Sequence, residues 1–121
     1  MWLLDTNALI KFKKEKFKIE SSSYNLYTTI FNIIEFPPSL NFDFLVILYP
    51  KLQTFEKALN YSVYLREKGT PLSIIDILIA TIAVENNLKI VTDDQDFDIL
   101  NLIEPKLYKI SFEQFLKEIK L

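Results

Sequence analysis

The sequence predicts a single α/β domain in which helices cover both faces of a parallel sheet. Short apolar runs typical of buried strands alternate along the chain with longer segments of helical periodicity. This alternation is typical of parallel strands joined by helices. The chain has 121 residues, of which half are hydrophobic. That is enough to form one hydrophobic core, so we expect residues 1–121 to form one domain.

The first half of the chain predicts three strands and two helices. In chain order these are a strand at Trp2–Leu4, a helix at about Ala8–Lys18, a strand at Asn25–Thr28, a helix from its cap Thr29 through Phe36, and a strand at Leu45–Tyr49. Thr6 or Asn7 can cap the first helix, and Ser21–Ser23 marks the loop that follows it. Pro37 and Pro38 end the second helix, because proline has no amide hydrogen and restricts the residue before it.

The second half predicts two strands and further helices. In chain order these are a helix at Leu52–Lys68, a helix from Ser73 to about Asn86, a strand at Lys89–Thr92, an acidic loop leading into Phe97–Leu102, a strand at Leu107–Ile110, and a helix at Phe112–Lys120. Gly69 stops the first of these helices, and Ser111 caps the last one. Ser73 and Asp76 have capping-box spacing at the start of a helix that is apolar on nearly every side, so this helix belongs in the core.

The composition excludes several classes of site. The chain has no Cys and no His, so it has no disulfide, thiol nucleophile, serine–histidine triad or imidazole metal ligand. The net charge of −2 gives no general attraction to nucleic acid, so such a substrate needs a local basic patch or bound cations. No targeting segment is evident, and the longest apolar runs, Phe44–Tyr49 and Ile77–Val84, are too short to span a membrane, so we expect a cytoplasmic protein.

Acidic residues stand at four places where an apolar chain would otherwise avoid them. Asp5 ends the first apolar run, Glu35 lies one residue before the end of the second predicted helix, and Asp76 lies inside the most apolar helix. The run Asp93–Asp98 follows a strand, and the carboxyl ends of parallel strands meet at one edge of a sheet, so we expect it near Asp5. A buried carboxylate is normally paired or bound to a metal, and an all-oxygen site favours Mg²⁺ or Mn²⁺. Because such cations activate water and stabilise charge on a phosphodiester, the acids favour metal-assisted phosphodiester hydrolysis.

Each acid also has a purely structural interpretation. Asp76 can be a helix cap, Glu35 can face solvent or pair with Lys, and Asp93–Asp98 can be an ordinary acidic turn. Asp5 is the hardest to explain in this way, because a strand end followed by a polar turn is a frequent ligand position. The only basic run of the sequence is either a solvated helix face or a contact to a phosphate backbone, and it consists of Lys11, Lys13, Lys14, Lys16 and Lys18.

Three motifs resemble those of PIN-domain proteins. Leu3–Asn7 resembles their opening motif, Pro71–Ala83 resembles their central helix, and Ile90–Phe97 resembles their strand and loop ending in Thr-x-Asp-x-Asp-Phe. The resemblance covers essentially the whole chain, and its specificity comes from the order and spacing of the motifs. The compact single-domain form is most similar to the VapC-type toxins of prokaryotic toxin–antitoxin pairs.

The resemblance implies a three-layer α/β/α fold, a five-stranded parallel sheet in the order 3-2-1-4-5, and RNA cleavage that depends on Mg²⁺ or Mn²⁺. The implied catalytic acids are Asp5, Glu35, Asp76 and Asp94. The implied metal ligands are Asp5, Asp76, Asp94 and Asp96, and the implied groups that orient them are Asn7 and Thr92. Asp93 falls at a variable position and receives no role. The implied partners are an RNA substrate, an antitoxin protein and a second copy of the chain.

The chain departs from this pattern between Phe36 and Phe44, where VapC-type proteins usually have a longer helical hairpin. That hairpin often helps to build the dimer surface and the antitoxin groove, so both partner expectations are weaker than the expectation for the acids. A non-catalytic PIN-like module that binds RNA or a protein is the alternative. A third interpretation is an aspartate-nucleophile phosphatase or a phospho-receiver domain. The phosphatase requires Asp-x-Asp where this chain has Asp5-Thr6-Asn7, and the receiver requires paired acids and a later Lys that the sequence does not supply.

Overall fold

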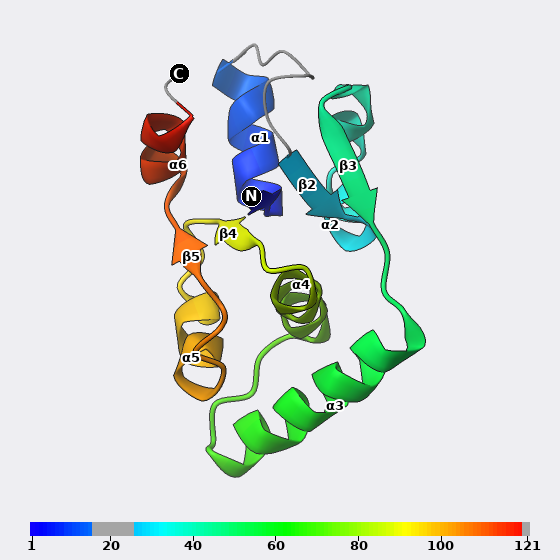
Figure 1. The fold of residues 1–121 in the computed structure, drawn as a ribbon, viewed down its shortest axis with the longest axis vertical. Helices are drawn as coiled ribbons and strands as arrows, with labels where there is room; N and C mark the ends of the chain where they lie inside the picture. The colour runs from blue at the N-terminus through cyan, green and yellow to red at the C-terminus, as the bar shows by residue number, and fades with distance from the viewer. Residues whose placement is uncertain (16–25, 120–121) are drawn as a thin grey trace.

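A five-stranded parallel sheet forms the centre of the structure, with its strands in the order β3-β2-β1-β4-β5 (Figure 1). The structure is a computed structural model that describes residues 1–15 and 26–119. The strands are β1 (Trp2–Leu4), β2 (Leu26–Thr29), β3 (Leu45–Leu48), β4 (Lys89–Val91) and β5 (Lys109–Ile110). Every neighbouring pair is parallel. The predicted parallel sheet and its strand order are therefore confirmed.

Helices cover both faces of this sheet. They are α1 (Thr6–Glu15), α2 (Ile30–Glu35), the 3₁₀ helix η1 (Pro37–Asn41), α3 (Leu52–Glu67), α4 (Ile74–Glu85), α5 (Asp96–Ile103) and α6 (Phe112–Glu118). Figure 1 shows α1 and α6 on one side of the strands, α4 and α5 on the other, and α3 packed outside α4. This is the predicted three-layer arrangement.

The central strands send alternate side chains into two separate cores. Leu3 and Ile90 are fully buried and pack with the apolar residues of α4 and α5. Their neighbours Leu4 and Val91 are also fully buried, but they pack in a second cluster with Phe12 and the rings of α6. Successive strand residues point to opposite faces of a sheet, so strands covered on both faces are apolar throughout. This explains why the strands are continuous apolar runs in the sequence.

Several predicted helix boundaries differ from the structure by one or two residues. The first helix begins at Thr6 instead of Ala8, because the carbonyl oxygen of Asp5 accepts the amides of Ala8 and Leu9, at 3.0 Å each. The second helix ends at Glu35, one residue before the predicted Phe36. Parts of the first predicted helix, of the serine loop and of the second predicted strand lie outside the described residues; they are Lys16–Lys18, Ser21–Ser23 and Asn25.

The last predicted elements are shorter than expected. Strand β5 covers only Lys109–Ile110, because the amide of Leu107 still bonds to the carbonyl of Glu104 in a turn. Helix α6 ends at Glu118 in the structure, and Lys120 lies outside the described residues.

The segment that departs from the VapC pattern folds as a short 3₁₀ helix. It begins at Pro37, and its neighbours Phe36, Phe42 and Phe44 pack against the core cluster of α1 and α6. The rings of Phe42 and Phe44 stack with centroids 5.3 Å apart. These three rings therefore belong to the core on this side of the sheet. None of the described helices has both the length and the apolar character required to cross a membrane.

Candidate metal centre

The carboxyl ends of β1 and β4 bring the first acid of the chain against the last acidic loop. The amide of Asp5 donates to the carbonyl of Val91 at 3.1 Å, which extends the pairing of the two strands by one residue. Asp5 therefore lies beside Thr92, the residue that follows β4. This is the edge of a parallel sheet at which ligands bind.

Three carboxylates converge next to this edge. One oxygen from each of Asp76, Asp94 and Asp96 lies within 4.8 Å of the others. Asp76 stands in the first turn of α4, where the hydroxyl of Ser73 accepts its amide at 3.1 Å. Asp94 accepts the amide of Asp96 at 2.9 Å, which turns the acidic loop towards α4. The structure thus brings together three of the four predicted metal ligands.

Asp5, the fourth, lies behind this group and is held by neutral donors. Its side chain is buried, with 6% of its surface exposed. Oδ1 accepts from the amide group of Asn32 at 2.9 Å, and Oδ2 accepts from the hydroxyl of Thr92 at 2.7 Å and from the amide group of Asn7 at 3.3 Å. These donors fix the orientation of a carboxylate that has no cationic partner among them.

Thr92 uses its full hydrogen-bonding capacity at this position. Its hydroxyl donates to Asp5 and accepts both from Asn7 Nδ2, at 2.8 Å, and from the amide of Asp94, at 3.0 Å. A hydroxyl has one hydrogen and two lone pairs, so all three are used. Asn7 and Thr92 therefore lie where the resemblance places groups that orient the acids, and Thr92 joins Asp5 to Asp94 directly.

Glu35 lies at the rim of the centre and apart from the three converging acids. Its side chain is exposed, and Oε1 accepts from the hydroxyl of Thr6 at 2.8 Å. The interpretation that Glu35 faces solvent therefore agrees with its exposure. Its carboxylate nevertheless remains close enough to Asp5 to raise the pKa of that group.

Burial and repulsion from neighbouring acids disfavour ionisation of Asp5 and Asp76. Burial is the main cause that raises the pKa of Asp5, and repulsion from Glu35 adds to it. Burial, followed by repulsion from Asp94, Asp5 and Asp96, raises the pKa of Asp76 to about 6. A divalent cation relieves this repulsion, and carboxylate oxygens are the ligands that Mg²⁺ and Mn²⁺ prefer. The donor set and its charge therefore fit such a cation.

The remaining acids of the acidic loop have other partners. Asp93 forms an ion pair with Lys11 and accepts the amide of Phe112, so Lys11 holds the pKa of this carboxyl below its usual value. Asp98 pairs with Lys109 at 3.1 Å on the surface. Asp93 and Asp98 are close to Asp94 and Asp96 in the sequence, but in the structure they pair with lysines instead of joining the cluster.

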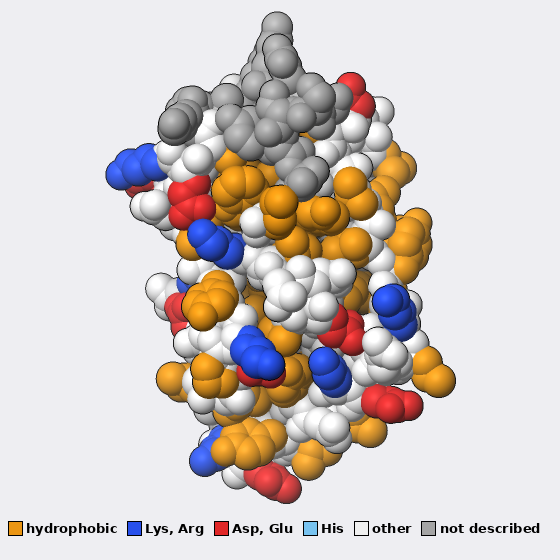
Figure 2. Space-filling model, viewed as in Figure 1, with side chains coloured by type: hydrophobic (Ala, Val, Ile, Leu, Met, Phe, Trp, Pro, Cys, Tyr) orange, Lys and Arg blue, Asp and Glu red, His pale blue; other side chains and the backbone are white. Residues whose placement is uncertain are grey.

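The basic run supplies no continuous basic surface in the described part of the chain. Lys11 is engaged with Asp93, whereas Lys13 and Lys14 are exposed on α1. Lys16 and Lys18 lie outside the described residues. On the face drawn in Figure 2, the blue side chains are scattered among red and orange ones instead of forming one patch.

Asn32 lies in this site but is not among the residues predicted from the sequence. It is completely buried and contacts Asp5 directly. An uncharged Asn in the middle of a helix carries no signal of metal chemistry. The only available signal was its spacing from Thr29, since a polar residue three positions after a helix cap is typical of a capping box.

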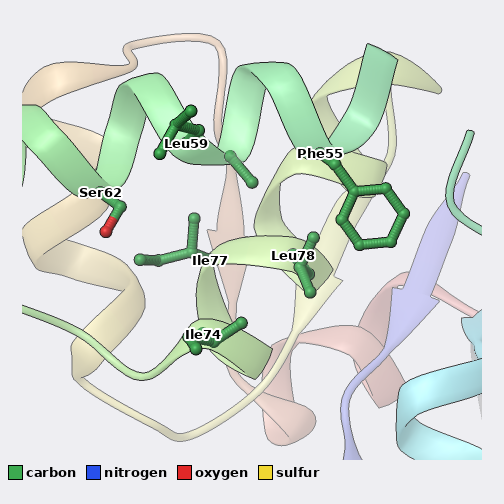
Figure 3. Close-up of a pocket in the computed structure, with 7 residues that line it drawn as sticks. Phe55, Leu59, Ser62, Ile74, Ile77 and Leu78 are labelled. Atoms are coloured by element: carbon green, nitrogen blue, oxygen red, sulfur yellow. The ribbon is translucent and has the colours of Figure 1, made fainter. Parts of the chain in front are cut away.

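An apolar groove lies between α3 and α4, away from the acids (Figure 3). Its lining includes Phe55 and Leu59 of α3 and Ile74, Ile77 and Leu78 of α4. The three α4 residues recur at helical spacing on one side of the helix, and Asp76 therefore projects from the opposite side. The groove and the acidic centre share one helix without sharing a surface.

Comparisons with known proteins agree with this architecture. A family model described as PIN domain matches residues 2–101. A chain of DNA-bound VapBC from Salmonella typhimurium has a TM-score of 0.73 and 20% identity, covering 92% of this chain and 97% of that chain. A chain of VapBC-1 from nontypeable Haemophilus influenzae has a TM-score of 0.72 and 21% identity, covering 93% of this chain and 98% of that chain. A chain of VapBC-5 from Mycobacterium tuberculosis has a TM-score of 0.69 and 18% identity, covering 91% of this chain and 97% of that chain. VapBC-5 is described as a member of the VapBC family of toxin–antitoxin systems. At these identities the similarity shows a shared fold, and no curated protein matches the chain.

Proposed function

The chain belongs to the PIN domain family, and from this premise we propose that it is a metal-dependent endoribonuclease that hydrolyses RNA phosphodiesters. The observation that carries the proposal is the convergence of Asp76, Asp94 and Asp96 beside the buried Asp5. A set of carboxylates without a cationic side chain among its described contacts is suited to a divalent cation. The chemistry also needs no His or Cys, which the chain lacks.

Asp76, Asp94, Asp96 and Asp5 would hold Mg²⁺ or Mn²⁺. A cation bound there supplies a Lewis acid that lowers the pKa of bound water and offsets the charge that develops on the phosphodiester. The residues of the chain position the acids for this. Thr92 holds Asp5 and the loop of Asp94 in one arrangement, and Asn7 supports Thr92 from α1.

Glu35 would serve the reaction from the rim of the site. Its exposed carboxylate is oriented by Thr6 and lies outside the converging group. It is therefore free to accept a proton or to orient a water molecule at the substrate side, a role in which a positioned carboxylate contributes by general base catalysis. We propose Asp5, Glu35, Asp76 and Asp94 as the catalytic acids.

We also propose that the protein is the toxin of a toxin–antitoxin pair and acts on RNA in the cytoplasm. The support is the similarity to the VapBC structures, one of which is described as a toxin–antitoxin system. The proposed partners are an antitoxin protein and a second copy of the chain. The alternative is a non-catalytic PIN-like module that binds RNA or a protein. The short η1 segment, which stands where the usual hairpin would be, supports this alternative.

The test is cleavage of a mixed RNA pool by the wild type, Asp5→Asn and Asp98→Asn, each with Mg²⁺, with Mn²⁺ and with EDTA. Asp98 is the matched control, because it is an acid of the same run, Asp93–Asp98, that pairs with Lys109 instead of joining the centre. We expect cleavage by the wild type and Asp98→Asn only when a cation is present, and none by Asp5→Asn. Folded wild type that cleaves nothing with either cation would support the non-catalytic module.

A further inference from the structure

We propose that Asn32 is a positioning residue of the metal centre: it holds Asp5 in the arrangement that a divalent cation requires and, through Thr6, it also holds Glu35 at the rim of the site. The inference rests on the cation-binding part of the proposed function. It concerns a neutral residue, and none of the hydrogen bonds given for its side chain goes to Asp76, Asp94 or Asp96. Its role follows from the hydrogen bonds that it makes.

The side chain of Asn32 connects two of the acids. Its amide nitrogen donates to Oδ1 of Asp5 at 2.9 Å and to the hydroxyl of Thr6 at 3.0 Å. That hydroxyl in turn donates to Glu35 at 2.8 Å. One buried amide group therefore sets the position of the innermost acid and, one bond further on, of the acid at the rim.

The orientation of this amide group is determined by its other end. Oδ1 of Asn32 accepts the amide of Thr29 at 3.2 Å and the hydroxyl of Thr29 at 2.6 Å. A backbone amide can only donate, so the oxygen must face Thr29 and the nitrogen must face Asp5. Both hydrogens and both lone pairs of the amide group are thus used, and a completely buried Asn32 has no freedom to turn.

A comparison with α3 separates this role from ordinary helix capping. Thr54 occupies the same place in α3 as Asn32 does in α2, three residues after the cap, and it is also buried. Its hydroxyl accepts the amide of Lys51 at 3.0 Å and donates once, to Glu85 at 2.7 Å. A hydroxyl would therefore suffice to close the capping box of α2.

Asn adds what a hydroxyl or an acid cannot supply at this place. It accepts from the cap and has two hydrogens left, one for Asp5 and one for Thr6. A Glu, which is common at this position of a capping box, would place a second carboxylate against Asp5. The choice of Asn is thus explained by the neighbouring acid and not by the helix.

The experiment measures Mn²⁺ binding without RNA, by electron paramagnetic resonance and calorimetry, on four proteins: the wild type, Asn32→Ala, Asn32→Thr and Thr54→Val. Asn32→Ala removes all four bonds. Asn32→Thr keeps a hydroxyl that can close the cap but has one hydrogen, so it retains folding if the alanine variant does not. Thr54→Val breaks the equivalent buried contacts of α3, which involve none of the acids of the proposed metal centre, and is the matched structural control.

We expect Asn32→Ala to bind Mn²⁺ about 10–100-fold more weakly than the wild type, as for other groups that orient metal ligands. Asn32→Thr should fall between the two, and Thr54→Val should bind Mn²⁺ like the wild type even though it is less stable. Equal affinity in Asn32→Ala and the wild type would overturn the proposal. An equal loss of Mn²⁺ affinity in Asn32→Ala and Thr54→Val would overturn it as well, because the cause would then be general destabilisation. A wild type that binds no Mn²⁺ would also overturn it.

This result is separate from the test of the nuclease. A wild type that binds Mn²⁺ and loses affinity on Asn32→Ala, yet cleaves no RNA, would leave the positioning role intact and remove the proposed activity. A wild type that cleaves RNA, together with an Asn32→Ala variant whose Mn²⁺ affinity is unchanged, would support the proposed activity and remove the positioning role.

Discussion

The hydroxyl of Thr92 donates to Oδ2 of Asp5 at 2.7 Å across 87 residues of sequence. Both residues are buried, and each follows directly after one of two adjacent parallel strands. This contact ties the end of β1 to the start of the acidic loop. It makes the position of Asp94, whose amide bonds to the same hydroxyl, dependent on the position of Asp5.

Removal of this hydroxyl should weaken metal binding as well as the fold. Thr92→Val leaves Asp5 and Asp94 without their shared partner, so we expect Mn²⁺ affinity to fall about 10–100-fold and unfolding free energy by about 1–3 kcal/mol. Thr28→Val is the control, since Thr28 is an equally buried Thr whose hydroxyl donates to the carbonyl of Leu4 at 2.7 Å. It should lose comparable stability and keep its Mn²⁺ affinity, as measured by urea unfolding and calorimetry. Equal affinities in the two variants would contradict the role of Thr92.

The metal-free protein should become less stable as pH rises from 5 to about 7.5. The pKa of Asp76 is raised to about 6, mainly by burial. The folded state therefore binds a proton that the unfolded state releases, and the stability that this proton contributes is lost as pH rises through 6. The raised pKa of Asp5 acts in the same direction, whereas the lowered pKa of Asp93 acts only at lower pH.

Melting temperatures in EDTA across this pH range provide the measurement. Asp76→Asn has no proton to lose at this position, so its melting temperature should change less with pH than that of the wild type. A wild type that is more stable at pH 7.5 than at pH 5 would contradict the prediction.

Mn²⁺ should stabilise the folded protein, and this effect should require the converging acids. A ligand that binds only the folded state contributes about 2.7 kcal/mol at a concentration 100 times its Kd. Asp94→Asn should lose most of the Mn²⁺-induced rise in melting temperature. Asp98→Asn should keep it, because Asp98 pairs with Lys109 outside the cluster. If both variants respond to Mn²⁺ like the wild type, the cation binds elsewhere.

Glu35→Gln should separate catalysis from metal binding. Glu35 lies outside the converging group and is held only at the rim by Thr6, so its loss should change Mn²⁺ affinity little. We expect RNA cleavage to fall by roughly 100-fold or more, the lower end of what a general base contributes. Glu56→Gln, at another exposed Glu, is the control for both readouts. A loss of Mn²⁺ affinity as large as that of Asp94→Asn would make Glu35 a metal ligand instead.

The sequence predicted the parts of the fold that depend on apolar periodicity and local capping. The strands around Leu3 and Ile90 are apolar because they are covered on both faces, and α4 is apolar because it is buried. Ser73 and Thr29 cap their helices as predicted. The strand order could not be read from these patterns and came from the family resemblance.

The details of the centre depended on contacts between distant residues. The pairing of Asp93 with Lys11 spans 82 residues, so no local pattern could separate Asp93 from Asp94 on physical grounds. Asn32 was missed because a neutral side chain gives no charge signal, and its importance comes only from the carboxylate that the fold places beside it. The positions of the predicted acids are now known, while their chemical roles stay predictions.

The acids of the proposed centre are separated by most of the chain, from Asp5 to Asp96, and the pairing of β1 with β4 is what places Asp5 beside the acidic loop. A ribosome-bound chain cannot build the centre until β4 and the loop after it have been synthesised. At roughly 5–20 residues per second, this leaves the growing chain without a complete set of acids for several seconds. The proposed nuclease would therefore be inactive throughout most of its own translation, when the message that encodes it is the nearest RNA.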